Sequence, residues 1–109
     1  MPVSLKKAYE ILEREEKVIA IAKGNSMKDY VPNNSIVKIR KFLPEKDTIR
    51  KGTIVLCKVK GKVYLHLVGA VKSYGKRKLY RIENARGKVN GWIPEKNIRG
   101  ILEEIIKQP

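Results

Sequence analysis

Two residues of the sequence could together activate a hydroxyl group for nucleophilic attack. Ser26 stands in the stretch Gly24-Asn25-Ser26-Met27, and His66 is the only histidine of the chain. A serine hydroxyl is a weak nucleophile until a base removes its proton, and a neutral imidazole suits that task near pH 7. The pair therefore indicates acyl-transfer chemistry, provided that the fold brings the two residues together.

Each residue also has a plainer interpretation. Gly-Asn-Ser is ordinary turn chemistry, because glycine accepts positive φ while asparagine and serine hydrogen-bond their own backbone. His66 lies in the run KVYLHLVGAV. Strand alternation there puts Tyr64, His66 and Val68 on one face and the intervening residues on the other. A lone histidine on a strand is more often structural than catalytic.

Metal and nucleotide chemistry find little support in the residue types. Cys57 is the only cysteine, and it lies in the apolar run GTIVLCKVK. Neither a disulfide nor a cysteine-rich zinc site can form within one chain, and we expect Cys57 to be a small core residue. One histidine without an acidic triplet does not supply three convergent ligands, and no phosphate-binding glycine loop is present. We expect no metal and no cofactor.

The elements that must position Ser26 and His66 are predicted to be mostly β-strands. Residues 1–16 form the exception, because apolar residues recur there at helical spacing, namely Leu5, Ala8, Tyr9 and Leu12, with Ser4 as N-cap. The run KVIAIAKG reads as a buried strand, and NNSIVKIRKF reads as a second strand entered through an Asn-Asn turn. Ser26 falls between these two strands.

The second half of the chain predicts a β-meander. The stretch FLPEKDTIRKG reads as a surface loop, and three β-rich runs follow, separated by Gly61 and by SYGKRK as hairpin tips. The tail WIPEKNIRGILEEIIKQP fits either a helix or a closing strand. We predict a strand to about Ile101 and then a short C-terminal helix. Residues 17–109 are thus expected to form a single β-rich domain behind the N-terminal helix.

The charge of the chain is strongly basic and uneven. Lys and Arg number 25 against 11 acidic residues, which gives a net charge of +14. Residues 17–109 carry +15, because residues 1–16 sum to −1. Such a field favours weak contact with nucleic acid or with an anionic membrane surface. The cations on predicted strands and tips are Lys38, Arg40, Lys41, Lys58, Lys60, Lys62, Lys76, Arg77, Lys78, Arg86 and Lys88, with Tyr30, Tyr74 and Tyr80 as stacking candidates. These lysines also have a plainer role as guards against sheet aggregation.

The sequence contains no apolar run near the roughly 20 residues that a membrane-spanning helix needs. The charged N-terminus also lacks the apolar segment of a signal peptide. We therefore expect a cytoplasmic protein without a transmembrane segment. The abundance of Lys, Arg, Glu, Ile and Val with few Gln fits a thermophile source.

The order of these pieces resembles the serine peptidase superfamily of signal peptidases and self-cleaving SOS repressors. In that superfamily a Ser-Met pair follows a strand, a Gly-Asp begins a second strand block, and the base lies one hairpin later. The matching pieces here are Ser26-Met27, Gly52-Thr53 and His66. The resemblance covers about residues 17–102 and implies coiled β-sheets of the signal peptidase and SOS-repressor type. It implies a peptide or protein as substrate.

A histidine base places the chain closer to one branch of the superfamily. Bacterial signal peptidase I and the SOS repressors use a lysine, whereas the archaeal and endoplasmic-reticulum signal peptidases use a histidine. The chain is similar to the histidine branch, although Asp29 replaces a usual proline, Thr53 stands where Asp is common and Leu67 replaces a usual arginine.

The third catalytic member implied by the resemblance is an aspartate, and this chain has none in the matching loop. The loop IENARGKVNGW places Asn84 and Asn90 at the expected positions, with Asn90 favoured, and Glu83 is its only acid. A neutral amide can orient an imidazole but does not stabilise an imidazolium as a carboxylate does. A slow Ser-His-Asn peptidase, a Ser-His-Glu peptidase and an inactive relative all remain open.

The resemblance also places the substrate beside an exposed strand. Main-chain pairing would give affinity, and small pockets would give specificity. The amide hydrogen of Ser26, assisted by Asn25, would bind the oxyanion, and Met27 would lie against the substrate. The alternatives are a non-enzymatic basic β-domain that binds nucleic acid, and a module of the same fold that binds a peptide without cutting it.

Overall fold

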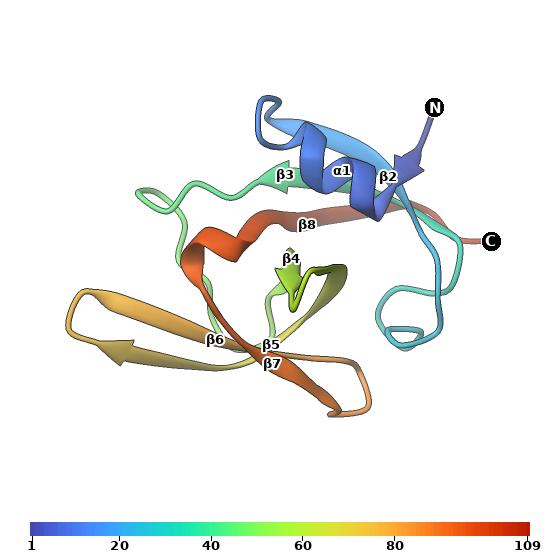
Figure 1. Cartoon of the computed structure of the whole chain (residues 1–109). Helices are drawn as coiled ribbons and strands as arrows, with labels where there is room; N and C mark the ends of the chain where they lie inside the picture. The colour runs from blue at the N-terminus through green and yellow to red at the C-terminus, as the bar shows by residue number, and fades with distance from the viewer.

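A computed structural model describes residues 1–109 and shows one eight-stranded sheet with a short α-helix near the N-terminus (Figure 1). The elements are β1 (Val3–Ser4), α1 (Leu5–Ile11), β2 (Lys17–Ala22), β3 (Ser35–Lys41), β4 (Ile54–Val59), β5 (Lys62–Tyr74), β6 (Arg77–Glu83), β7 (Val89–Pro94), a 3-10 turn (Glu95–Asn97) and β8 (Ile98–Lys107). The strand order is β1-β2-β3-β8-β4-β5-β6-β7. The predicted mainly β fold with an N-terminal helix is confirmed.

The sheet curls so that β2, β3 and β8 form one layer and β5, β6 and β7 another, with β4 between them (Figure 1). Neighbouring strands are antiparallel, except that β1 runs parallel to β2. The predicted strands on either side of Ser26 are β2 and β3, and the predicted meander is β4, β5 and β6. The connection from Phe42 to Thr53 contains no helix or strand, as expected for a loop.

Helix α1 begins where the sequence predicts and ends earlier than residue 16. The Ser4 hydroxyl accepts a hydrogen bond from the Lys7 amide over 3.1 Å, which makes it the N-cap. Ala8, Tyr9 and Leu12 of the apolar stripe are buried in the core, and Leu5 is partly buried. Three glutamates lie just beyond Leu12, where negative charge is unfavourable next to the helix C-terminus. No helix of the chain has the length and apolar character needed to cross a membrane.

The β4–β5 hairpin lies between two hydrophobic clusters. Leu56 and Leu65 join the first cluster, which contains the buried residues of α1, β2 and β3. Val55, Cys57 and Val68 join the second, which contains the buried residues of β6 and β7. Alternate residues therefore face opposite cores, which explains the continuous apolar run in this part of the sequence. Cys57 is a buried free thiol, as predicted, and burial raises its pKa to about 12.

Strand β5 changes its hydrogen-bonding partner along its length. Residues 62–67 pair with β4, whereas pairing with β6 begins only at Leu67. The hairpin closes with a two-residue turn in which Lys60 and Gly61 both have positive φ, +50° and +83°. This is the type I′ turn expected between twisted strands. The first half of β5 consequently has one edge without a partner strand.

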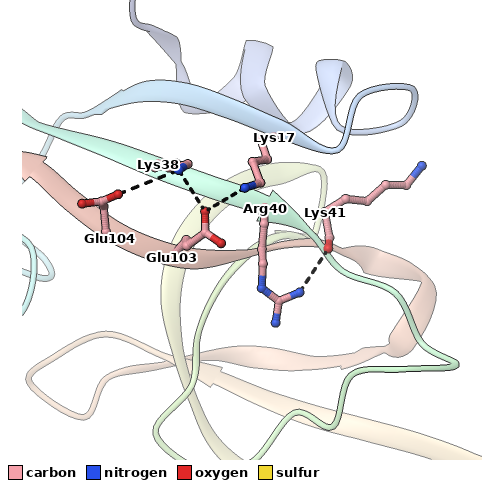
Figure 2. A network of polar contacts seen from close by, with 6 residues as sticks. All are labelled: Lys17, Lys38, Arg40, Lys41, Glu103 and Glu104. Atoms are coloured by element: carbon pink, nitrogen blue, oxygen red, sulfur yellow. Dashed lines mark hydrogen bonds and ion pairs between the residues drawn. The ribbon is translucent and has the colours of Figure 1, made fainter.

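The predicted C-terminal helix is wrong, because β8 continues as a strand to Lys107. Figure 2 shows what holds this segment: Glu103 and Glu104 project from β8 towards the lysines of β2 and β3. The Glu103 carboxylate lies 3.5 Å from Lys38 Nζ and 3.8 Å from Lys17 Nζ. Pairing with β3 along residues 100–107 satisfies backbone groups that a short isolated helix would leave exposed.

Bulges in β8 explain why its sequence resembles a helix. The register shifts at three places and leaves Arg99, Glu103 and Ile106 as extra residues without a cross-strand partner. Each bulge resets the inward and outward alternation of side chains. Apolar residues therefore recur at intervals of three and one instead of two, which is the spacing of an amphipathic helix.

Gly100 lies where β8 packs closely against Ile39 and against Leu12 at the end of α1, and its replacement tests this packing. A β-carbon there would come 2.6 Å from Ile39 Cγ2 and 2.7 Å from Leu12 Cδ1, both in fully buried side chains. We expect Gly100→Ala to lower the free energy of unfolding by about 1–3 kcal/mol through overpacking. Denaturant unfolding measures this loss, with the exposed Ser73→Ala as control. Equal stabilities of the two variants would contradict the packing described.

Candidate functional site

Ser26 lies in the loop between β2 and β3, four residues beyond the end of β2. The loop is anchored on both sides of it: the Gly24 amide donates to Asn33 Oδ1 over 2.7 Å, and Met27 is buried in the first cluster. The Ser26 carbonyl accepts a hydrogen bond of 3.0 Å from the Ala85 amide. Ser26 itself is exposed. These contacts fix the backbone while leaving the hydroxyl accessible to a ligand.

The structure brings Ser26 and His66 together. Ser26 Oγ lies 3.0 Å from His66 Nε2, within hydrogen-bond distance. His66 Nδ1 lies 2.7 Å from Asn90 Oδ1. An Nδ1–H that donates to the amide oxygen leaves Nε2 as the acceptor for the serine hydroxyl. The three side chains thus form a relay with the tautomer that a general base requires.

Asn90 reaches the imidazole because of an irregularity in β7. Ile82 pairs with Gly91 and Glu83 pairs with Val89, so that Asn90 is the extra residue of a β-bulge. A bulge redirects a side chain out of the regular pleat, and bulges are frequent beside functional sites. The amide is thereby placed against His66, on the first half of β5.

The other two candidates for the third member have different partners. Asn84 Oδ1 accepts hydrogen bonds from the amides of Arg86 and Lys88, over 2.9 and 3.0 Å, and so shapes the β6–β7 turn. The Glu83 carboxylate lies over Gly69 and pairs with Arg81 Nε at 3.1 Å. Neither side chain orients His66, and the structure therefore favours Asn90 over both.

His66 is almost fully buried, and this determines its protonation. Burial lowers the pKa of the imidazole below its ordinary value of 6.5, because the charged form loses hydration. The hydrogen bond with Asn90 opposes part of that shift. The ring also packs against Tyr64, with ring centroids 4.7 Å apart and planes inclined by 36°. His66 is therefore neutral at pH 7, the state in which it can accept a proton.

A cleft of about 270 Å³ opens beside the pair. Ser26 and His66 lie on its wall, and most of the lining is apolar, contributed by Leu5, Ala22, Met27, Val31, Val63 and Leu65. The predicted substrate contact Met27 is part of this wall.

Ser26 also supplies a free amide hydrogen. Its N–H donates no backbone hydrogen bond within the chain, and neither does that of Asn25, whose carbonyl accepts from Lys28 over 3.3 Å. The Asn25 side chain is exposed. An unpaired backbone N–H next to a serine hydroxyl is the kind of donor that binds a developing oxyanion.

Two contributors to the site were missed in the sequence. Ala85 fastens the serine loop through its amide, and a backbone contact of this kind carries no signature in residue type. Tyr64 was placed on the same face as His66 by strand alternation, but no role was assigned to it. The strand pattern could have suggested contact between the two rings, since they are two residues apart on one face.

Comparison with known proteins yields no relative: no protein-family model, no curated protein and no solved structure matches the chain. The small, curled, mainly β sheet is compatible in general class with a β-rich peptidase fold. The residues of the site and their geometry are therefore the basis for inferring a function.

The single histidine allows its titration to be followed directly by NMR of the imidazole ring. We expect the pKa of His66 to lie below 6.5 in the folded protein and to rise in Asn90→Asp, because a carboxylate stabilises the imidazolium. Asn84→Asp is the matched control, since that side chain faces loop amides. An equal rise in both variants would contradict the placement of Asn90.

The same shift makes stability depend on pH in a defined direction. Because the folded pKa is lowered, the unfolded chain binds the proton more readily between the two pKa values. The contribution of His66 to the free energy of unfolding is therefore complete above about pH 6.5 and is lost as the pH falls through the lower, folded value.

Proposed function

We propose that the protein is a serine endopeptidase that cleaves an extended peptide with the Ser26–His66 pair, oriented by Asn90. The observation that carries this proposal is the relay of two hydrogen bonds, 3.0 and 2.7 Å long, that ends at an open apolar cleft. A purely structural histidine needs neither an exposed hydroxyl as partner nor a cleft beside it. The family resemblance described from the sequence supports the same chemistry.

The proposed reaction follows the geometry of the relay. His66 Nε2 accepts the hydroxyl proton while Ser26 Oγ bonds to the carbonyl carbon, and the Ser26 amide binds the oxyanion. The imidazolium then gives this proton to the leaving amine as the C–N bond breaks. Water repeats the sequence on the acyl-serine: His66 takes its proton, the hydroxide oxygen bonds to the carbonyl carbon, and Ser26 Oγ leaves with the proton.

A neutral Asn90 limits the rate of this reaction. The imidazolium formed in the transition state gains only the amide dipole, while its burial at His66 opposes the positive charge. In one serine protease, replacement of the triad aspartate by asparagine lowers kcat roughly 10⁴-fold because the imidazole is then held in the wrong tautomer. Asn90 Oδ1 accepts from Nδ1 and so avoids that loss, but its dipole stabilises the imidazolium less than a carboxylate would. We therefore propose a slow peptidase, suited to a single cleavage or to a long-lived complex.

The proposed substrate is a peptide or protein segment in extended form. The unpaired edge of β5 borders the cleft and offers backbone groups for the addition of one more strand. The apolar lining favours a small uncharged side chain next to the scissile bond. Ligand binding without cleavage is the corresponding role if Ser26 is not activated.

Nucleic-acid binding is a second candidate function, favoured by one exposed face of β5–β7. Trp92 is 37% exposed there, with Lys72 Nζ 4.7 Å above its ring and the Arg81 guanidinium at 5.9 Å. Base stacking and phosphate contacts need such groups. We rank it second, because several of the predicted contacts are absent from this surface.

Those predicted contacts are engaged elsewhere in the fold. Tyr80 is 1% exposed, so that its proposed stacking role is wrong. Lys38 pairs with Glu103 and Glu104, and Arg40 pairs with Asp47 at 2.9 Å, which removes two of the predicted free cations. The remaining basic surface predicts weak contact with nucleic acid or an anionic membrane surface.

Covalent labelling tests whether Ser26 is activated. We expect a serine-directed phosphonate to add one label per chain, detected by mass spectrometry at Ser26, and to be lost in Ser26→Ala. Ser73→Ala, which removes an exposed hydroxyl on β5, should label normally. His66→Ala should abolish labelling as well, and thermal unfolding of the same samples shows whether it remains folded. Labelling that persists in folded His66→Ala would refute the proposed base.

Introducing a carboxylate at position 90 tests the proposed cause of slow turnover. We expect Asn90→Asp to raise kcat for a peptide substrate by at least about tenfold, because a carboxylate beside Nδ1 stabilises the imidazolium formed in the transition state. Asn84→Asp should leave kcat near the wild-type value. Unchanged rates in Asn90→Asp would mean that the amide does not limit catalysis.

A further inference from the structure

The cleft at Ser26 is one part of a longer groove. Two further cavities of about 380 and 400 Å³ adjoin it, and Val63 lines all three. Tyr64 links the first cavity to the second, and Leu5 links it to the third. The groove therefore runs along the first half of β5, with α1 on its opposite side.

The backbone of β5 offers hydrogen-bonding groups to this groove. In a hairpin closed by a two-residue turn, Val59 and Lys62 form a hydrogen-bonded pair, and such pairs alternate along the ladder. Tyr64 and His66 therefore bond to β4, whereas Val63 and Leu65 direct their N–H and C=O groups away from it. An extended peptide can pair with Val63, which is half-buried, and it reaches Leu65, which is 4% exposed, only by entering the groove.

Unpaired lysines surround the groove beyond the apolar cleft. They are Lys6, Lys23, Lys58 and Lys62, and none of them forms a salt bridge within the chain. The only acidic residue in the lining is Glu10, which lies 3.7 Å from the Lys7 ammonium. The Lys58 ammonium is held 5.0 Å from the centre of the Tyr9 ring. The groove thus presents fixed positive charge around a strand-binding edge.

We infer that the peptide bound in this groove is acidic, with Asp or Glu side chains several residues away from the small apolar residue that enters the cleft beside Ser26. The inference rests on the proposed function for the position of the scissile bond. It extends that function by naming the charge of the substrate. Complementary charge would also speed the encounter with such a peptide.

A peptide fits the groove better than a nucleic acid does. The backbone groups of Val63 and Leu65 match the spacing of a polypeptide strand, and the floor at Leu5, Met27 and Val31 is apolar. A phosphate backbone would satisfy the lysines but would leave this hydrogen-bonding edge unused.

Binding to the Ser26→Ala protein tests the inference without requiring catalysis. The probes are fluorescently labelled eleven-residue peptides with three central alanines and four residues on each side. Two of them carry aspartate at the four positions of the N-terminal or of the C-terminal side, and in the others serine or lysine replaces the aspartates. We expect one of the two aspartate peptides to bind about tenfold more tightly than the serine peptide at low salt. Each exposed ion pair raises the affinity a few-fold. The advantage should shrink near about 0.5 M NaCl.

Charge reversal identifies the residues responsible. Lys58→Glu with Lys62→Glu should abolish the preference for aspartate and make the lysine peptide the tighter ligand. Lys76→Glu with Lys78→Glu changes the net charge equally at the β5–β6 hairpin, outside the groove, and should keep the preference for aspartate. Lys6→Glu with Lys62→Glu repeats the test at exposed positions, in case loss of the Lys58–Tyr9 contact prevents folding.

Three results would overturn the inference. Equal binding of aspartate and serine peptides would do so, as would an equal loss of preference in the hairpin control. The third is displacement of the peptide by a twelve-residue oligothymidine whose affinity depends on Lys62, which would assign the groove to nucleic acid. Selective binding of the aspartate peptide, together with failure of phosphonate labelling in the wild type, would refute the peptidase and leave the acidic-peptide groove standing.

Discussion

The change of partner along β5 is the constraint on which the site depends. Pairing with β4 stops at Leu67, where pairing with β6 begins, so that His66 lies at the end of a strand segment with one open edge. Continued pairing with β6 would have covered the backbone of Val63 and Leu65 and left no room for the loop that carries Ser26. The base, the cleft and the groove all follow from this one break in the ladder.

The burial of His66 and the lack of charge on Asn90 together determine the chemistry of the relay. The fold keeps the imidazole uncharged by excluding water and supplies Asn90 as a dipole in place of a counter-charge. The imidazole is thereby kept in its free-base form, and both its affinity for a proton and the stability of the charged intermediate are reduced.

The pattern of neighbouring residue types was sufficient to predict most of the fold. The Ser4 cap, the type I′ turn at Lys60-Gly61 and the alternation around His66 are encoded by neighbouring residues, and each lies where the sequence predicts. The β-bulges could not be predicted from neighbouring residues, because a residue is an extra one only relative to the strand with which it pairs. This explains the wrong helix after Ile101, and it explains why Asn84 stayed an alternative to the favoured Asn90. The proximity of Ser26 and His66 followed from the order of elements, whereas the lysine-lined groove depends on three cavities that meet only in space.

The two halves of the relay belong to regions of very different local stability. His66 lies in the hairpin enclosed between both hydrophobic clusters, where we expect the amide hydrogens bonded between β4 and β5 to be among the slowest to exchange with solvent. Ser26 lies on a loop held by a few hydrogen bonds, among them the one from Ala85. Local opening of that loop separates the hydroxyl from a base that stays in place. Heating would therefore disassemble the relay before the sheet melts, and cooling would rebuild it without refolding.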